Sequence, residues 1–337
     1  MKRIRNLFDK IISTENFIDA VYKASKNKRH RPYVIQFNKH LMDNIAEIGR
    51  ELESGKYMPG SYREFYIYDK KLRKISAAPF RDRVVHHALC NVIMPHFEKS
   101  FIDTSFANRS GKGTHRAVRL CQLYLSKNRY YVKLDIQKYF PSIDHEVLKN
   151  IVQRKIKCRK TLGLVDIIID NSNLQDSPSF YFTDDGLFAP YQRRKGLPIG
   201  NLTSQYFANI YLTPLDHFIK EQLRIKNYIR YVDDFVIFGD DKDFLRLCVK
   251  RITVFLEQYR LKIHDKKADI RKTCDGITFL GYRVFPGYIR ITAENFVKAR
   301  RRLKRNLFLL NNGFMSFKSF NSSYQAWQGH VKIVAEF

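Results

Sequence analysis

Two short β-rich runs of this chain carry carboxylates at positions where a strand should end or turn. Residues 130–135 are YYVKLD, an alternating pattern that predicts a strand ending at Asp135. Residues 228–238 are YIRYVDDFVIF, which predicts a hairpin with Asp233 and Asp234 in its turn. Carboxylates that a fold brings together repel and raise one another's pKa. A chain that keeps three of them beside buried strands is therefore expected to hold a cation there.

Magnesium is the cation that this residue chemistry favours. Mg²⁺ takes hard oxygen ligands, usually one or two carboxylates together with waters and substrate phosphates. Two such ions about 3.5–4 Å apart can hold the attacking and leaving oxygens of an in-line phosphoryl transfer. Taken alone, Asp233-Asp234 is more typical of an ordinary polar turn. Asp135 on a separate strand, together with the charge of the chain, favours the metal site.

The charge of the chain points to a polyanionic partner. Lys and Arg number 61 against 33 Asp and Glu, which gives a formal net charge of +28 over 337 residues. Nucleic acid is the usual partner for such an excess, and a solvated basic protein is the alternative. Aromatic residues make up 14%, a content that excludes wholesale disorder, and hydrophobic residues make up 44%, enough for a sizeable core.

Cysteine and hydropathy patterns limit the compartment and the metal chemistry. The five cysteines form no CxxC pair, so neither a disulfide framework nor a zinc ribbon is expected. His86, His87, Cys90 and His96 lie close in sequence, but their spacing favours one helix face beside a core over a zinc site. No apolar run approaches membrane-spanning length, and the N-terminus lacks a signal peptide. We expect a cytoplasmic protein with no membrane partner.

Hydrophobic periodicity predicts an α+β fold. Helices are expected over residues 1–55, with Phe37, Leu41, Ile45 and Ile48 on one face. Helices and β-rich runs then alternate along the middle of the chain, an order that suits a split βαβ sheet. The other expected strands cover 62–75, 278–284 and 288–291, and the other expected helices cover 81–97, 114–125, 244–259 and the basic C-terminal residues.

Seven motifs in order resemble those of reverse transcriptases. YVDDF at 231–235 is similar to the YxDD box of that family, and LDIQKYFPSID at 134–144 to its first palm motif. The remaining motifs are KLRKISAAPFRDRVVHHAL at 71–89, SFANRSGKGTHRAV at 105–118, GLPIGNLTSQ at 196–205, LKIHDKKADI at 261–270 and FLGYRVF at 279–285. The resemblance covers roughly residues 60–290. It implies an RNA-directed DNA polymerase that acts on template RNA, an RNA–cDNA duplex and dNTPs.

The resemblance also implies a catalytic set. Asp135 and Asp233 would ligate two Mg²⁺ ions, for which Mn²⁺ can substitute, with help from the Ile136 carbonyl. Asp234 would support the second carboxylate position. Phe140 matches the steric gate that excludes a 2′-hydroxyl, and the alternative for this residue is an ordinary core aromatic.

Basic residues of two other motifs match nucleotide contacts of the family. Lys71 and Arg73 match the residues that hold the triphosphate, although nearby cations could equally contact template. Lys267 matches the lysine near the leaving pyrophosphate, with the adjacent Lys266 as the alternative register. Phe279–Tyr282 matches the primer grip.

The fold implied by the resemblance is a right hand with fingers, a ferredoxin-like palm and a short helical thumb. Residues 1–60 would form an N-terminal helical extension of the fingers, residues 61–285 the fingers and palm, and residues 286–337 a basic helical thumb. On the thumb helix, Lys298, Arg301, Arg302 and Arg305 would follow the nucleic-acid backbone, with Phe296, Leu303 and Phe308 available for packing.

Two departures from the commonest motif indicate a subgroup. Most reverse transcriptases have QGxxxSP where this chain has IGNLTSQ, so Ile199 replaces Gln and Gln205 replaces Pro. This pair is typical of enzymes from diversity-generating retroelements, which copy a template-repeat RNA into cDNA with errors at template adenines for mutagenic retrohoming. The resemblance then implies low fidelity and a small basic ring-forming accessory protein that helps to bind RNA.

Three rival functions stay open at this stage. One is another bacterial reverse transcriptase, of the group II intron or retron type. The second is an untemplated polymerase of the abortive-infection type. The third is an RNA-binding protein that kept the fold without catalysis, which the presence of Asp135, Asp233 and Asp234 disfavours.

Overall fold

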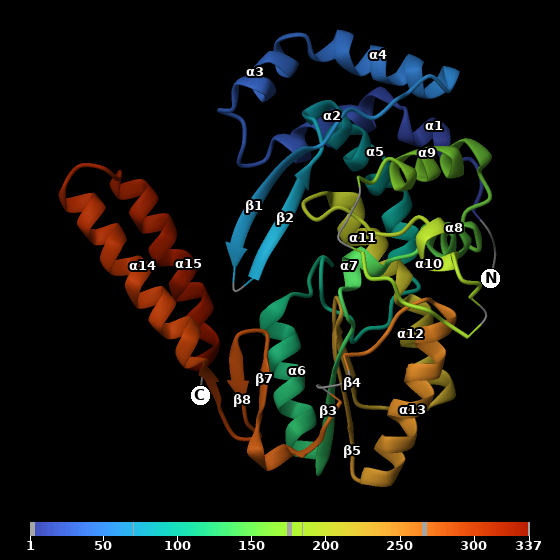
Figure 1. The fold of residues 1–337 in the computed structure, drawn as a ribbon. Coiled ribbons are helices and arrows are strands. Elements are labelled where there is room, and N and C mark those ends of the chain that lie inside the picture. The colour runs from blue at the N-terminus through green and yellow to red at the C-terminus, as the bar shows by residue number, and fades with distance from the viewer. Residues whose placement is uncertain (1–3, 70, 174–176, 184, 265–267, 336–337) are drawn as a thin grey trace. The chain divides into compact units, whose positions relative to one another are not determined.

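The computed structural model describes residues 4–69, 71–173, 177–183, 185–264 and 268–335 (Figure 1). The chain divides into two compact units, each assembled from three separate stretches. The first unit comprises residues 1–103, 136–218 and 252–264, and the second comprises residues 104–135, 219–251 and 265–337. Helices and strands occur in both units, so the expected α+β class is confirmed.

A four-stranded antiparallel sheet organises the second unit. Its strand order is β4-β5-β3-β6. Along the chain, one strand is followed by helices, two strands, a helix and a last strand, which is the element order of a ferredoxin-like motif. The strands are β3 (Tyr130–Asp135), β4 (Tyr228–Tyr231), β5 (Asp234–Gly239) and β6 (Ile270–Lys272), and α13 (Lys242–Gln258) precedes β6.

A second, three-stranded sheet lies in the same unit. The run 278–284, which we expected to be one strand, is two strands of a hairpin. Leu280 and Gly281 form its turn with φ of 50° and 88°, and so reverse the chain in two residues. The strands are β7 (Ile277–Phe279), β8 (Tyr282–Val284) and β9 (Ile289–Ile291). With α6 (Thr114–Lys127), they share one apolar core that includes Val118, Tyr131 and Val236.

Two antiparallel helices, α14 (Ala293–Asn311) and α15 (Phe317–Ala335), end the second unit (Figure 1). Their contact uses small and polar side chains: Ala299 and Asn306 of α14 are buried, and Asn306 Nδ2 donates to Ser323 Oγ at 3.0 Å. Phe296 and Phe308, which we expected to pack, are instead more than half exposed. The Phe296 ring nevertheless lies 6.5 Å from the Trp327 ring of α15, so this side of α14 also faces its partner helix. The expected basic residues Lys298, Arg301, Arg302 and Arg305 are exposed.

Helices dominate the first unit. The periodic run 37–48 spans two helices, because the backbone leaves the helical region at His40. Asn16 joins α2 to α5 by donating Nδ2 to the Ala88 carbonyl at 3.0 Å. The N-terminal helices are α1 (Phe8–Ile11), α2 (Thr14–Ser25), α3 (Pro32–Lys39), α4 (Leu41–Ser54) and α5 (Phe80–Glu98).

A two-stranded hairpin and a run of short helices complete the first unit. Strands β1 (Arg63–Asp69) and β2 (Lys71–Ala77) pair antiparallel as a separate ribbon (Figure 1). Asp144 caps α8 by accepting from the Val147 N–H at 3.1 Å, which explains why the helix begins there. The helices are α7 (Tyr139–Ser142), α8 (His145–Gln153), α9 (Arg159–Asp170), α10 (Ala189–Gln192), α11 (Leu202–Tyr211) and α12 (Thr213–His217).

The described residues contain no helix that could cross a membrane. None of the helices in the described part of the chain combines the length and the apolar character that a bilayer crossing requires.

Candidate active site

Two of the expected catalytic aspartates face each other at the end of the second unit's sheet. The register of β3 with β5 pairs Asp135 with Asp234. Residues directly opposed in antiparallel strands have Cβ atoms roughly 4.5–5.5 Å apart, and both side chains are half-buried. Asp233 is the residue before this pair. The structure therefore brings the three aspartates of the prediction to one end of the sheet.

The turn that carries Asp233 differs by one residue from the prediction. We expected Asp233 and Asp234 to form it, but the pairing of Tyr231 with Asp234 leaves Val232 and Asp233 as the two turn residues. Asp234 is the first residue of β5. Val232 adopts φ 58°, the left-handed conformation that a two-residue hairpin turn demands.

Val232 is an unfavourable residue for that conformation, and its neighbours hold it there. A β-branched residue with positive φ is a true outlier that costs of the order of 1–3 kcal/mol. Arg230, whose side chain is fully buried, donates Nη1 to the Val232 carbonyl at 3.1 Å. The Tyr231 hydroxyl lies 3.2 Å from Thr114 Oγ1. These contacts hold the hairpin backbone immediately before Asp233 in place.

Lys133 provides a cation beside the aspartates. It lies on β3 two residues before Asp135, so both side chains leave the same face of the strand. Its Nζ is 3.1 Å from Asp234 Oδ2. The ammonium group therefore offsets part of the repulsion between the paired carboxylates.

The donor set fits magnesium bound together with a phosphorylated substrate. Among the described residues, no three or more His, Cys, Asp or Glu side chains are grouped to hold a metal ion by themselves. Magnesium seldom uses such a cage, since one or two carboxylates with waters and substrate phosphates satisfy it. Asp135, Asp233 and Asp234 supply hard oxygens of this kind. The same chemistry suits Mn²⁺.

The loop that contains Ile199 is attached to strand β2 of the first unit. The Ser76 N–H donates to the Ile199 carbonyl at 2.9 Å. Asn201 then makes two bonds with its amide: Nδ2 donates to the Ser76 carbonyl at 2.9 Å, and Oδ1 accepts from the Ala78 N–H at 3.1 Å. Asn201 is only 3% exposed. The loop is therefore hydrogen-bonded to the backbone at the end of β2, much as a third strand of the β1–β2 ribbon would be.

Gly200 allows this close approach. Its φ is +119°, and an added Cβ would lie 2.9 Å from Ile75 Cγ2. Both the conformation and the space exclude a larger residue. The position of Ile199 is therefore set by the backbone of the loop rather than by its own side chain, which is half-buried.

Three further predicted residues of the first unit differ in exposure. Phe140 lies on α7 and is half-buried, whereas its neighbour Tyr139 is 2% exposed and packs as the core aromatic. The Phe140 carbonyl accepts from the Leu197 N–H at 2.9 Å, which attaches α7 to the loop before Ile199. Gln205 is exposed in the first turn of α11. Ile136 is 2% exposed.

The predicted triphosphate residues lie on the β1–β2 ribbon. Lys71 and Arg73 are exposed and two residues apart on β2, so they share a face. Arg73 is opposite Ile67 in the register. Lys267, predicted beside the pyrophosphate, and its alternative Lys266 lie outside the described residues.

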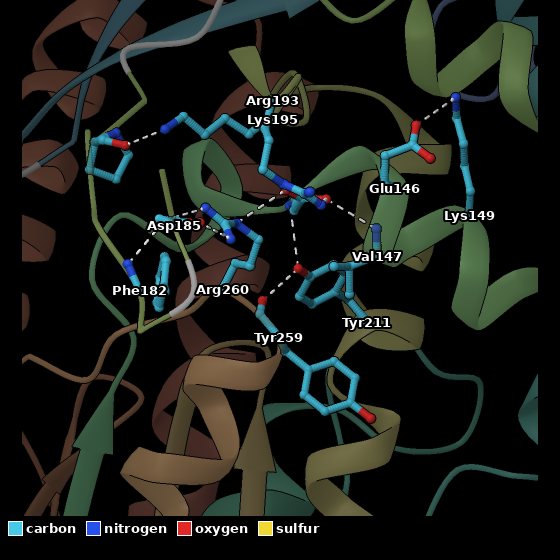
Figure 2. Close-up of polar contacts among 12 residues, drawn as sticks. Glu146, Val147, Lys149, Phe182, Asp185, Arg193, Lys195, Tyr211, Tyr259 and Arg260 are labelled. Atoms are coloured by element: carbon cyan, nitrogen blue, oxygen red, sulfur yellow. Dashed lines mark hydrogen bonds and ion pairs between the residues drawn. The ribbon is translucent and has the colours of Figure 1, made fainter. Parts of the chain in front are cut away.

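A buried ionic cluster in the first unit holds the segment before the Ile199 loop (Figure 2). Arg193 binds Asp144 with two hydrogen bonds of 2.6 and 2.8 Å. Arg260 binds Asp185 with two of 2.7 Å, and these bonds lower the pKa of Asp185. The Tyr211 hydroxyl donates to the Tyr259 carbonyl at 2.7 Å beside them. The cluster is balanced in charge and joins residues distant in sequence, which favours a structural role.

Of the four residues predicted on one helix face beside a core, His86 and Cys90 lie there, whereas His87 and His96 are half-buried. His86 and Cys90 are buried on α5. Burial lowers the pKa of His86 to about 3, so the imidazole is neutral at physiological pH. Burial also raises the pKa of the Cys90 thiol. No metal-binding group occurs there within the described residues.

Sequence reasoning missed Lys133, Arg230 and Asn201. A signal existed for the first two, because a lysine and an arginine interrupt strands that are otherwise rich in apolar residues. Lys133 also precedes Asp135 by two, the spacing of one strand face. Asn201 gave no such signal, since its partners are more than a hundred residues away.

The comparisons with known proteins agree with the motif order. Residues 66–284 match the family model described as "Reverse transcriptase (RNA-dependent DNA polymerase)". Protein YkfC of Escherichia coli (strain K12) is 25% identical over 328 residues, which cover 84% of this chain and 83% of that protein.

Two relatives are named for introns. The group II intron-encoded protein LtrA of Lactococcus lactis subsp. cremoris is 29% identical over 190 residues, or 55% of this chain and 29% of LtrA. Nuclear intron maturase 1, mitochondrial, of Arabidopsis thaliana is 33% identical over 99 residues, or 28% of this chain and 14% of the maturase. The chain thus spans less than a third of either relative.

Proposed function

Because the chain belongs to the reverse transcriptase (RNA-dependent DNA polymerase) family, we propose that it extends a primer 3′-hydroxyl with dNTPs on an RNA template. Family membership confirms the expected enzyme class, an RNA-directed DNA polymerase. The observation that carries the proposal is the β3–β5 register, which opposes Asp135 and Asp234 with Asp233 in the adjoining turn. The sequence match to the family does not by itself show that the three carboxylates lie at one end of the sheet, whereas the register does.

The aspartates would bind two Mg²⁺ ions, with Asp135, Asp233 and the Ile136 carbonyl as ligands and Asp234 in support. When bound, such ions activate the attacking hydroxyl and stabilise the leaving oxygen. The chain's own contribution is to hold the carboxylates in place before the nucleotide arrives. The Arg230 bond to the Val232 carbonyl and the Lys133 pair with Asp234 support this role.

The first unit would supply the nucleotide contacts. Lys71 and Arg73 would neutralise the triphosphate, and their exposure on one ribbon face supports this. Phe140 would exclude a 2′-hydroxyl, a role that its partly exposed position supports. Ile199 and Gln205 would lie beside the templating base. Lys267 would approach the pyrophosphate.

In the right-hand arrangement that we propose, residues 61–285 form the fingers and palm, and residues 1–60 extend the fingers. Residues 286–337 form the thumb. The exposed cations of α14 support contact with the phosphates of an RNA–cDNA duplex, a contact that positions nucleic acid without discriminating its sequence.

Within the family, we assign the chain to the enzymes of diversity-generating retroelements. The support is the IGNLTSQ motif, in which Ile199 and Gln205 replace the commoner Gln and Pro. The chain would then copy a template-repeat RNA into cDNA with errors at template adenines, and would work with a small basic ring-forming accessory protein.

A group II intron or retron type is the second candidate. The specific observation in its favour is that LtrA and the Arabidopsis maturase are named for introns. Errors at template adenines are implied for the retroelement type alone, so the error spectrum of the cDNA separates the two candidates.

Primer extension on a defined RNA template tests the general proposal. Wild-type protein should incorporate dNTPs only with template and divalent metal, and Asp135→Asn should abolish incorporation while leaving RNA binding nearly intact. Incorporation by Asp135→Asn at the wild-type rate would refute the assignment. Sequencing the cDNA tests the subgroup: errors concentrated at template adenines support the retroelement type, and errors spread evenly over the four template bases count against it.

A further inference from the structure

Lys133 connects the aspartate pair to another strand of the second unit. Besides its 3.1 Å contact with Asp234 Oδ2, its Nζ donates to the Thr278 carbonyl on β7 at 3.3 Å. The Phe279 ring centroid is 5.9 Å from the same Nζ. One ammonium group thus contacts both the aspartate pair, where β3 and β5 meet, and β7, whose last residue is the first of the FLGYRVF motif.

The ammonium group can donate one more hydrogen bond. It has three N–H donors, and its contacts in the described part of the chain engage Asp234 and Thr278. The Lys133 side chain is 30% exposed and that of Asp234 is 29% exposed. Solvent therefore reaches the pair, and a further acceptor can approach from that side.

Breaking the ion pair between Lys133 and Asp234 also costs little free energy. A salt bridge that solvent reaches contributes roughly 0–1 kcal/mol, so Lys133 can turn toward a stronger acceptor at small cost. A phosphate oxygen is such an acceptor, because charge-assisted bonds to it are short and strong. The chain has a net charge of +28, and the proposed function would bring the 3′ end of a primer to the neighbouring aspartates, so a backbone phosphate of that strand would be within reach.

We propose that Lys133 positions the primer: it binds a backbone phosphate of the strand whose 3′ end reacts at the aspartates. The inference rests on the proposed function, since it needs a primer at this site. It assigns a role to a residue outside the catalytic aspartates. It also explains why a lysine interrupts the strand that ends at Asp135.

The test pairs two lysine variants with neutralised phosphates. Lys133→Met removes the charge and keeps the length of the side chain, and Lys133→Arg keeps the charge. Lys272→Met is the matched control, because Lys272 is an exposed lysine on β6 of the same sheet. Binding to a primer–template duplex is measured by fluorescence anisotropy in EDTA, so catalysis does not enter. The duplexes carry one methylphosphonate at each of the last three primer linkages in turn.

Lys133→Met should weaken binding about tenfold, the value of one charge-assisted bond at a partly exposed site, and should reduce the salt slope by about 1. One methylphosphonate position should weaken wild-type and Lys133→Arg binding by the same factor and leave Lys133→Met unaffected. Lys272→Met should retain the wild-type sensitivity. Equal sensitivity of Lys133→Met and wild-type protein at all three linkages would overturn the proposal. Primer extension by wild-type protein tests the proposed function separately, so the two can fail independently.

Discussion

Replacing Asn201 with alanine should destabilise the protein through the loss of two buried hydrogen bonds. The change removes the Asn201 amide, whose Nδ2 donates to the Ser76 carbonyl and whose Oδ1 accepts from the Ala78 N–H. Ser76 is 0% and Ala78 2% exposed, so water cannot readily replace the amide. Each buried polar group left unsatisfied costs about 1–3 kcal/mol. The free energy of unfolding should therefore fall by about 2–6 kcal/mol.

Urea denaturation followed by far-ultraviolet circular dichroism measures this change. The midpoint should move to lower urea at an unchanged slope, because the exposed surface on unfolding stays the same. Gln205→Ala is the control: it truncates an exposed amide four residues later and should change stability by less than about 0.5 kcal/mol. A loss below 1 kcal/mol for Asn201→Ala, by contrast, would show that the loop is not held as we describe.

Three further predictions concern selectivity, fidelity and pH. Phe140→Ala should raise the ratio of rNTP to dNTP incorporation, and an unchanged ratio in a folded variant would make Phe140 a packing residue only. Ile199→Gln should lower misincorporation opposite template adenine in sequenced cDNA, because glutamine can hydrogen-bond the template strand; an unaltered error spectrum would contradict this. The pKa of His86 is lowered by burial to about 3, so the unfolded state binds the extra proton and stability is lost as pH falls below 6.5. His86 should account for about 2 kcal/mol of the loss by pH 5. That part should be missing in His86→Leu, while His87, whose pKa is lowered by burial to about 4, keeps its own share, and the exposed control His30→Gln should follow the wild type; a parallel pH profile for His86→Leu would contradict it.

Local patterns predicted most of the strands, because alternation and turn chemistry are local properties. The strand ending at Asp135 lies where the sequence indicated, whereas the run 278–284 proved to be two strands. The predicted position of the hairpin turn was wrong by one residue, because the position depends on the pairing register of β4 and β5 rather than on turn propensity. Propensity disfavours a valine with positive φ, and no sequence rule would place one there.

Contacts between distant segments could not be predicted. The attachment of Asn201 to β2 depends on how the loop meets a hairpin far earlier in the chain. The packing of α14 was only partly predicted for the same reason: Phe296 contacts Trp327 of α15 but stays more than half exposed, whereas the small Ala299 is buried. A single sequence contains the side chains of such contacts without their partners.

The left-handed valine has a consequence for the entropy of substrate binding. A β-branched side chain has few rotamers and narrows the backbone states of its neighbours, whereas glycine at position 232 would relieve the strain and widen them. With Val232 and the Arg230 bond in place, the freedom of Asp233 is given up when the chain folds. If metal and nucleotide bind there as we propose, less of that freedom has to be lost on binding, so the strain of one turn residue lowers the entropic cost of assembling the reacting complex.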